Sequence, residues 1–169
     1  MKTLRPLLLA LSLTTASRAL PPLGAQDDFK PDLAPAWTLK DVEGQAVSSD
    51  QLKGKVIVLD FWATWCGPCR SEIPGYVELQ SQYGPSGLTI VGVSLDRGAD
   101  AVAVVKKSIA ELKINYQIVL GDERIVEAFG GVEAIPTTFI LDRAGAVRFR
   151  KVGAMAPEEF AAALRPFLK

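Results

Sequence analysis

Two continuous apolar runs, each bounded by turn residues, mark buried strands in the middle of this chain. The first is Val-Ile-Val-Leu-Asp-Phe-Trp at 56–62, and the second covers 88–95, after the break at Gly84–Gly87. Apolar runs of this length without alternation are typical of strands that are buried on both faces of a sheet. Shorter extended segments predict the remaining strands at 37–39, 46–48, 116–120, 137–141 and 146–152.

Helical patterns fill the stretches between these strands. Apolar side chains recur every three or four residues over 101–112, and a second apolar face runs along 157–168. A third helix is predicted from Arg70 to about Tyr83, opened by Pro68, and a short one covers 125–129. Pro74 lies inside the third helix, where we expect a kink.

The order of these elements predicts an α/β fold. It begins with a hairpin around Asp41–Gly44, continues as strand–helix–strand–helix, and ends with a second hairpin and a helix. A strand–helix–strand unit produces parallel neighbours, whereas hairpins produce antiparallel ones. The sequence therefore predicts one mixed sheet with helices on both faces.

Composition narrows the possible functions. The chain has 169 residues, of which 49% are hydrophobic, which suits one domain with a sizeable core. Lysine and arginine balance the acidic residues, so the formal net charge is zero, and no basic stripe points to nucleic acid. No glycine-rich phosphate loop occurs, and we expect no NAD or flavin cofactor.

The first residues have the layout of a secretory signal. Lys2 and Arg5 precede a short apolar run at 7–16, and small residues follow, with Ala19 and Ala25 at possible cleavage positions. The run is about half of the ~20 residues that a membrane span needs, so cleavage is favoured over an uncleaved anchor. We expect residues 1–25 to be a signal peptide, 26–35 a linker and 36–169 one domain in a secreted or periplasmic protein.

The two cysteines of the chain stand together in Trp65-Cys66-Gly67-Pro68-Cys69, between the buried strand at 56–62 and the helix that follows. The chain has no histidine and no third cysteine, so this pair is not a zinc site. Arg70 stands where haem attachment would need histidine. A purely structural disulfide would gain little from closing so short a loop. The pair therefore predicts redox chemistry at a helix N-terminus, where a thiolate is stabilised.

Several segments resemble one known family. Leu59–Arg70 resembles the active-site segment of thioredoxins, and Ala134–Phe139 resembles their cis-proline loop. The leading hairpin, the Cys-Arg-x-Glu-x-Pro pattern at 69–74 and the extra helix and strand at 101–120 are similar to TlpA/ResA-type thiol–disulfide oxidoreductases. The resemblance covers about residues 35–169 and implies a thioredoxin fold with an inserted helix–strand.

Position and resemblance together assign expected roles to the thiols. Cys66, at the helix start, should be the exposed nucleophile, and Cys69, which we expect to be buried, should resolve the mixed disulfide. Without histidine, the proton acceptor must be a carboxylate or water, and Asp60 and Glu72 are the candidates. We expect Asp60 to be buried with a raised pKa, and Glu72 to lie on the same helix face as Cys69.

The remaining expected site residues would bind the substrate. We expect a cis bond between Ile135 and Pro136, which should lie against the thiols. The backbone edge at Ile135 could then pair with an extended substrate segment. Trp65, Gly67 and Pro68 should line the same surface.

The leading hypothesis is an extracytoplasmic reductase that receives electrons from a membrane thiol donor and reduces disulfides of exported proteins as a monomer. A peroxiredoxin needs Pro and Thr where Leu59 and Ala63 stand, which argues against that activity. A secreted binding or chaperone module with the same fold is a second hypothesis, although the intact cysteine motif argues against it. Net oxidation or isomerisation is a third, because the direction depends on the redox potential.

Overall fold

The computed structural model describes residues 33–168. The predicted signal segment and most of the predicted linker lie outside this range. One seven-stranded sheet organises the described chain, with the strand order β2-β1-β5-β4-β3-β6-β7. Its strands are β1 Thr38–Asp41, β2 Ala46–Ser48, β3 Val56–Trp62, β4 Leu88–Ser94, β5 Gln117–Leu120, β6 Thr137–Leu141 and β7 Val147–Val152.

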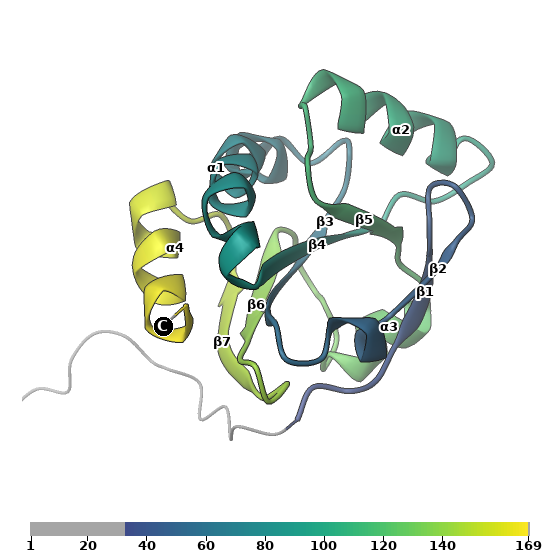
Figure 1. The fold of residues 1–169 in the computed structure, drawn as a ribbon. Helices are drawn as coiled ribbons and strands as arrows, with labels where there is room; N and C mark the ends of the chain where they lie inside the picture. The colour runs from purple at the N-terminus through teal and green to yellow at the C-terminus, as the bar shows by residue number, and fades with distance from the viewer. Residues whose placement is uncertain (1–32, 169) are drawn as a thin grey trace, which may run out of the picture.

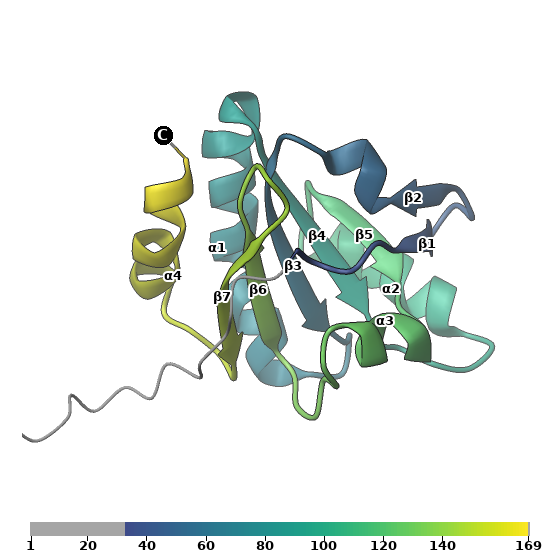
Figure 2. The same cartoon turned by 90° about the horizontal axis from the view of Figure 1, so that it is seen from below.

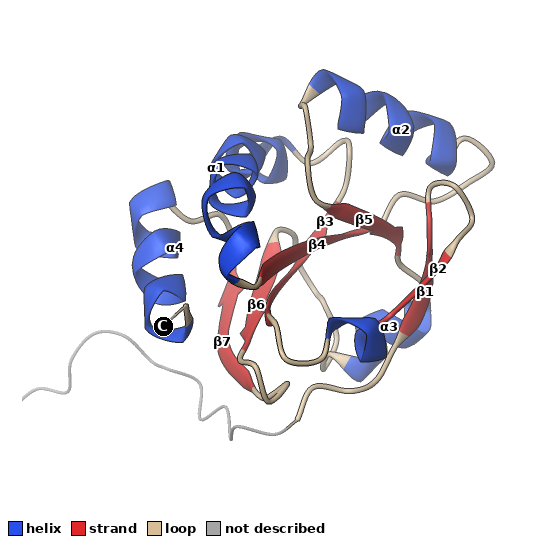
Figure 3. Cartoon of the chain, viewed as in Figure 1, coloured by secondary structure: helices blue, strands red, loops and turns tan. Residues whose placement is uncertain are grey.

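The sheet is mixed, as the sequence predicts. Strand β4 pairs in parallel with β3 and β5, whereas the N-terminal hairpin and the C-terminal pair β6–β7 are antiparallel. Strand β3 lies near the middle of the sheet, between β4 and the antiparallel β6. Figure 3 shows this sheet in red, with helices around it.

Helices cover both faces of the sheet (Figures 1 and 2). They are α1 Gly67–Tyr83, α2 Ala101–Glu111, α3 Glu123–Ala128 and α4 Pro157–Leu164. Helices α1, α2 and α4 pack on one face, where their apolar side chains form two adjoining clusters. Helix α3 packs on the opposite face in a cluster of its own. The predicted helix–strand insert is present as α2 and β5.

Alternation along β3 separates these two layers. Val56, Val58 and Trp62 belong to the clusters under α1, α2 and α4, whereas Ile57, Leu59 and Phe61 belong to the cluster under α3. All seven residues of β3 are buried, because helices cover the strand from both sides. By the same alternation, Asp60 points toward α1, the helix that carries the cysteine pair.

Two helix boundaries differ from the sequence prediction by three residues or more. Helix α1 begins at Gly67 rather than Arg70, with Cys66 as its N-cap residue, and Pro74 lies inside it without ending it. Helix α4 ends at Leu164 and continues only as a 3-10 turn over Arg165–Phe167. Pro166 has no N–H to donate to the helix, so regular hydrogen bonding cannot continue through it.

Candidate functional site: a disulfide at the start of helix α1

The cysteine pair lies where β3 turns into α1 and is closed as a disulfide in this structure. Cys66 takes extended backbone angles at the N-cap, and its Sγ accepts a hydrogen bond from the Cys69 N–H at 3.2 Å. The helix that follows has 17 residues, and its N-terminal dipole would favour a thiolate at this position once the disulfide is reduced.

The prediction that Cys66 is exposed is wrong for this disulfide state. Its exposed fraction is 5%, against 1% for Cys69. The cover comes from a distant segment, since the Ile135 carbonyl oxygen lies 3.8 Å from the Cys66 Sγ. Cys66 is still the cysteine nearer the surface, because the neighbouring Gly67 and Pro68 are exposed and Trp65 keeps 71% of its surface exposed.

The segment that covers Cys66 is the predicted proline loop. The Ile135–Pro136 bond is cis, which confirms the prediction. Thr137 Oγ1 donates to the Ala134 carbonyl at 2.6 Å, and the Gly153 N–H donates to the Pro136 carbonyl at 2.8 Å, so the loop is held on both sides. Among the described residues, the Ile135 N–H makes no backbone hydrogen bond, which leaves it available to a substrate strand.

Asp60 is buried beneath α1, as the sequence predicts. The antiparallel register of β3 and β6 places Thr138 opposite Asp60, and Thr138 Oγ1 donates to Asp60 Oδ1 at 3.0 Å. The Tyr76 hydroxyl lies 3.2 Å from Thr138 Oγ1. Because Thr138 has one hydroxyl proton and gives it to Asp60, Tyr76 must donate in its turn. The chain Tyr76–Thr138–Asp60 therefore fixes the carboxyl group.

The pKa of Asp60 is raised from 3.8 to about 7, chiefly by burial and further by the negative charge of Glu72, while the hydrogen bond from Thr138 partly opposes the rise. Burial also raises the pKa of Tyr76, which stays a neutral donor. Asp60 is thus a carboxyl group that can take up or release a proton near neutral pH.

Glu72 lies one turn after Cys69 on α1 and is also buried, with 8% of its surface exposed. Its Oε1 accepts a hydrogen bond from the Met155 N–H at 2.6 Å, which ties α1 to the loop before α4. Its Oε2 is buried and accepts no hydrogen bond from the described residues. Burial raises the pKa of Glu72, while the Met155 N–H and the Lys151 charge oppose the rise.

Sequence reasoning missed Thr138, Tyr76 and Met155. Thr138 and Tyr76 look like an ordinary strand residue and an ordinary helix residue until the pairing of β3 with β6 is known. Met155 contributes only its backbone N–H, so no side-chain pattern could have identified it. The structure therefore adds a hydrogen-bonded frame to the two predicted carboxyl groups.

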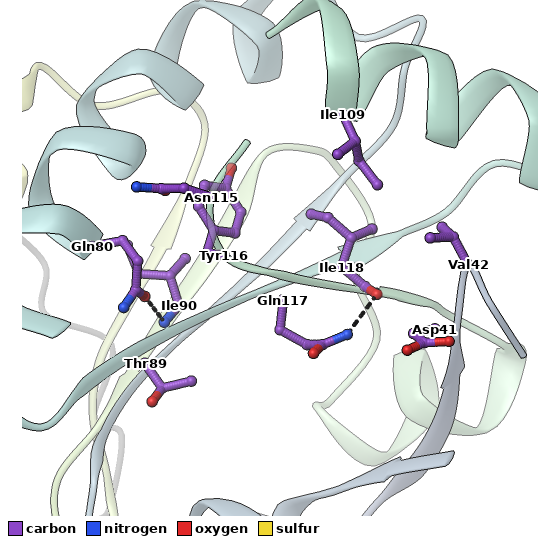
Figure 4. Close-up of a pocket in the computed structure, with 10 residues that line it drawn as sticks. All are labelled: Asp41, Val42, Gln80, Thr89, Ile90, Ile109, Asn115, Tyr116, Gln117 and Ile118. Carbon is purple, nitrogen blue, oxygen red and sulfur yellow. Dashed lines mark hydrogen bonds between the residues drawn. The ribbon is translucent and has the colours of Figure 1, made fainter. Parts of the chain in front are cut away.

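A separate pocket of about 420 Å³ lies between α1, α2 and the sheet (Figure 4). None of the predicted site residues lines it. Two of its polar side chains hold local structure: Gln80 Oε1 accepts from the Ile90 N–H at 2.8 Å, and Asn115 Nδ2 donates to the Val77 carbonyl at 3.1 Å. The redox site, which contains the predicted residues, remains the candidate functional site.

Two further observations concern residues 33–168 only. This part of the chain contains no group of three or more Cys, Asp or Glu side chains placed to hold a metal ion. In the same range, no helix combines the length and apolar character that crossing a bilayer requires.

Comparisons with known proteins agree with this geometry. The model of the AhpC/TSA family matches residues 31–150. The thioredoxin-like protein YneN of Bacillus subtilis is 34% identical over 126 residues, covering 75% of this chain and 73% of its own length. The thiol-disulfide oxidoreductase ResA of Bacillus thuringiensis is 29% identical over 126 residues, covering 75% and 71%.

A solved structure shows the same fold. It is a thiol:disulfide interchange protein of the thioredoxin family from Chlorobium tepidum, 33% identical to this chain. Its TM-score is 0.75, and the match covers 84% of this chain and 99% of the other. The expected thioredoxin fold is confirmed.

Proposed function

Since this chain belongs to the AhpC/TSA family, we propose that within the family it acts as a thiol–disulfide oxidoreductase that reduces disulfides of exported proteins through Cys66 and Cys69. The observation that carries the proposal is the disulfide at the N-terminus of α1, with the cis-proline loop against the Cys66 sulfur. The names of the relatives, which are thiol–disulfide oxidoreductases and a thioredoxin-like protein, support the same class of reaction.

The reaction runs in two exchange steps. In the reduced protein, the Cys66 thiolate attacks one sulfur of a substrate disulfide, forms a mixed disulfide and releases the first substrate thiolate. The Cys69 thiolate then attacks the Cys66 sulfur and releases the second. The substrate gains two electrons and the protein is left with the Cys66–Cys69 disulfide, which is the state described here.

Cys69 must lose its proton before the second step. Asp60 and Glu72 are the proposed proton acceptors, because both are buried on the α1 side of the sheet and the negative charge of Glu72 helps to raise the pKa of Asp60. A carboxyl group with a pKa of about 7, such as Asp60, suits proton transfer near neutral pH. The hydrogen bond from Thr138 keeps one oxygen of Asp60 fixed during that transfer.

The substrate would lie across the surface around Cys66. Trp65, Gly67 and Pro68 form one exposed side of this surface. Ile135 and Pro136 form the other side, where the free N–H of Ile135 could pair with an extended segment of the substrate. An extended, disulfide-bearing chain fits this arrangement, because the Ile135 backbone lies beside the Cys66 sulfur and its N–H can pair with a peptide.

Location and partners complete the proposal. The signal-like residues 1–25 support export with cleavage of the signal, and disulfide-bearing substrates are found in oxidising compartments. Re-reduction of the protein then requires a membrane thiol donor. We propose that the protein acts there as a monomer.

An insulin-reduction assay with dithiothreitol as electron donor tests the activity. The wild-type protein should accelerate precipitation of the insulin B chain, Cys66→Ser should be inactive, and Cys69→Ser should accumulate mixed disulfides. The reduction potential tests the direction: a value of about −270 mV supports a reductase, whereas a value of about −120 mV makes the protein a net oxidant. No turnover by the wild type would support the binding-module hypothesis instead.

A further inference from the structure

A buried carboxylate outside the redox pair holds the turn that leads into it. Asp96 follows the end of β4 and is buried. Its Oδ2 accepts from the Thr64 N–H at 3.0 Å, and its Oδ1 accepts from Thr64 Oγ1 at 2.6 Å. Ser94 Oγ donates to Oδ2 at 2.8 Å. Asp96 therefore fixes both the main chain and the side chain of Thr64, which lies two residues before Cys66.

The parallel pairing of β3 and β4 brings these residues together. Trp62 and Ser94 are register partners at the ends of the two strands, and the Leu95 N–H donates to the Trp62 carbonyl at 2.8 Å. The chain after β4 thus runs beside the turn after β3. The Asp96 N–H also donates to Ser94 Oγ at 3.2 Å. Ser94, the last residue of β4, therefore holds both the main chain and the carboxylate of Asp96.

Neutral groups supply these contacts. Arg97 is the adjacent cation, but its guanidinium donates to the Gly121 carbonyl at 2.8 Å and to the Asp96 main-chain carbonyl at 3.4 Å. Among the described residues, no lysine or arginine forms an ion pair with the Asp96 carboxylate. Burying a carboxylate without a cation is costly, and a neutral residue of similar size could fill the space. We therefore look for the role of the Asp96 carboxylate in the two hydrogen bonds that it accepts from Thr64.

We propose that Asp96 is a positioning residue for the exchange reaction and that Thr64 transmits its effect to Cys66. The turn over 63–66 is closed by a hydrogen bond from the Cys66 N–H to the Ala63 carbonyl at 3.1 Å. Thr64 lies inside this turn, so fixing it fixes Cys66 as the N-cap residue of α1. The hydrogen bonds from Thr64 to Asp96 also fix the backbone next to Trp65, whose side chain is exposed to solvent.

The consequence falls on the resolving step. During that step Cys69 must meet the sulfur of Cys66 while Cys66 is joined to a substrate. Intramolecular attack gains its speed from a fixed approach, and a displacement of about 1 Å can cost a hundredfold in rate. A loosened turn would lengthen the life of the mixed disulfide. This inference rests on the proposed exchange function and adds a residue that controls its rate.

Three variants at the two positions test the inference. Thr64→Val removes the hydroxyl donor, Asp96→Asn removes the charge and one acceptor, and Thr64→Ser keeps the donor. Thr89→Val, at a half-buried threonine of β4 outside the site, is the matched control. The readouts are resolution of a mixed disulfide between Cys66 and glutathione, alkylation of Cys66 by iodoacetamide as a function of pH, and thermal stability.

Thr64→Val and Asp96→Asn should each slow resolution about tenfold and shift the pH profile of alkylation. Thr64→Ser and Thr89→Val should resolve at the wild-type rate. Because the two positions act through the same pair of hydrogen bonds, the double variant should be no slower than the slower single variant. If Asp96→Asn does not fold, the two Thr64 variants carry the same comparison.

Wild-type resolution rates and pH profiles in folded Thr64→Val would overturn the inference. So would losses that follow thermal stability alone, in Thr89→Val as in the others. A wild-type protein that alkylates normally but reduces no insulin would instead contradict the proposed function, because alkylation and glutathione exchange report on Cys66 without a protein substrate.

Discussion

Replacing Asp60 with asparagine should stabilise the protein, and the gain should grow as the pH rises. In the folded chain the pKa of Asp60 is raised from 3.8 to about 7, chiefly by burial. Between these two values the unfolded chain has released its proton while the folded chain still holds it. The free energy of unfolding therefore falls as the pH rises through this window. Asparagine is neutral at every pH, and its side-chain oxygen can still accept the hydrogen bond from Thr138.

The size of the effect follows from the two pKa values. Each pH unit within the window is worth about 1.4 kcal/mol, so the complete destabilisation by ionised Asp60 is ~4 kcal/mol above the window. About 2 to 3 kcal/mol of this develops between about pH 5 and about pH 8. Urea unfolding of the oxidised protein at these two pH values measures it, as the difference between the variant and the wild type.

The stability measurement on Asp60→Asn needs a control for the substitution itself. Asp100→Asn, at an exposed carboxylate before α2, controls for an Asp-to-Asn substitution as such. If the stability difference between Asp60→Asn and the wild type were the same at both pH values, the proton on Asp60 would not be coupled to folding in this range. The assignment of Asp60 as a proton acceptor near neutral pH would then lose its basis.

Two further predictions concern the surroundings of Asp60. Thr138→Val removes the hydrogen bond that lowers the Asp60 pKa, so the carboxyl titration followed by carbon-13 NMR should move to higher pH; an unchanged midpoint would contradict it. Glu72→Gln removes a negative charge that raises the same pKa, so the titration should move to lower pH, and disulfide exchange should slow by roughly ten- to a thousand-fold if Glu72 takes the Cys69 proton.

Local pattern predicted the elements of this fold well, for a definite reason. The residues of β3 are buried on both faces, so an uninterrupted apolar run identifies the strand without knowledge of its neighbours. The sequence pattern predicts the start of α1 three residues too late, because Gly67 has low helix propensity and only the Cys66 cap shows where the helix begins. Helix α4 ends at Leu164, although the apolar pattern predicts a helix to 168. Pro166 is the residue in the sequence that indicates the earlier end.

The cysteines and the burial of Asp60 could also be predicted, since both depend on the immediate sequence. The place of Ile135 and Pro136 against the thiols could be expected only from the family resemblance and not from local pattern, because Ile135 is 69 residues from Cys66 along the chain. The partner of Asp60 could not be predicted, because Thr138 is 78 residues away. A pattern of apolar and polar positions predicts which face a side chain takes but not which residue it meets on that face.

The pairing of β3 with β4 and β6 determines which residues come into contact at this site. Antiparallel pairing of β3 with β6 places Thr138 beside Asp60 and brings Pro136, just before β6, to the end of β3 where Cys66 follows. Parallel pairing of β3 with β4 brings Asp96 to Thr64 at the same end. A slip of one residue between β3 and β6 would turn Thr138 to the α3 face and leave Asp60 without its donor. The register of the central strands is therefore as much a part of this redox site as the two cysteines.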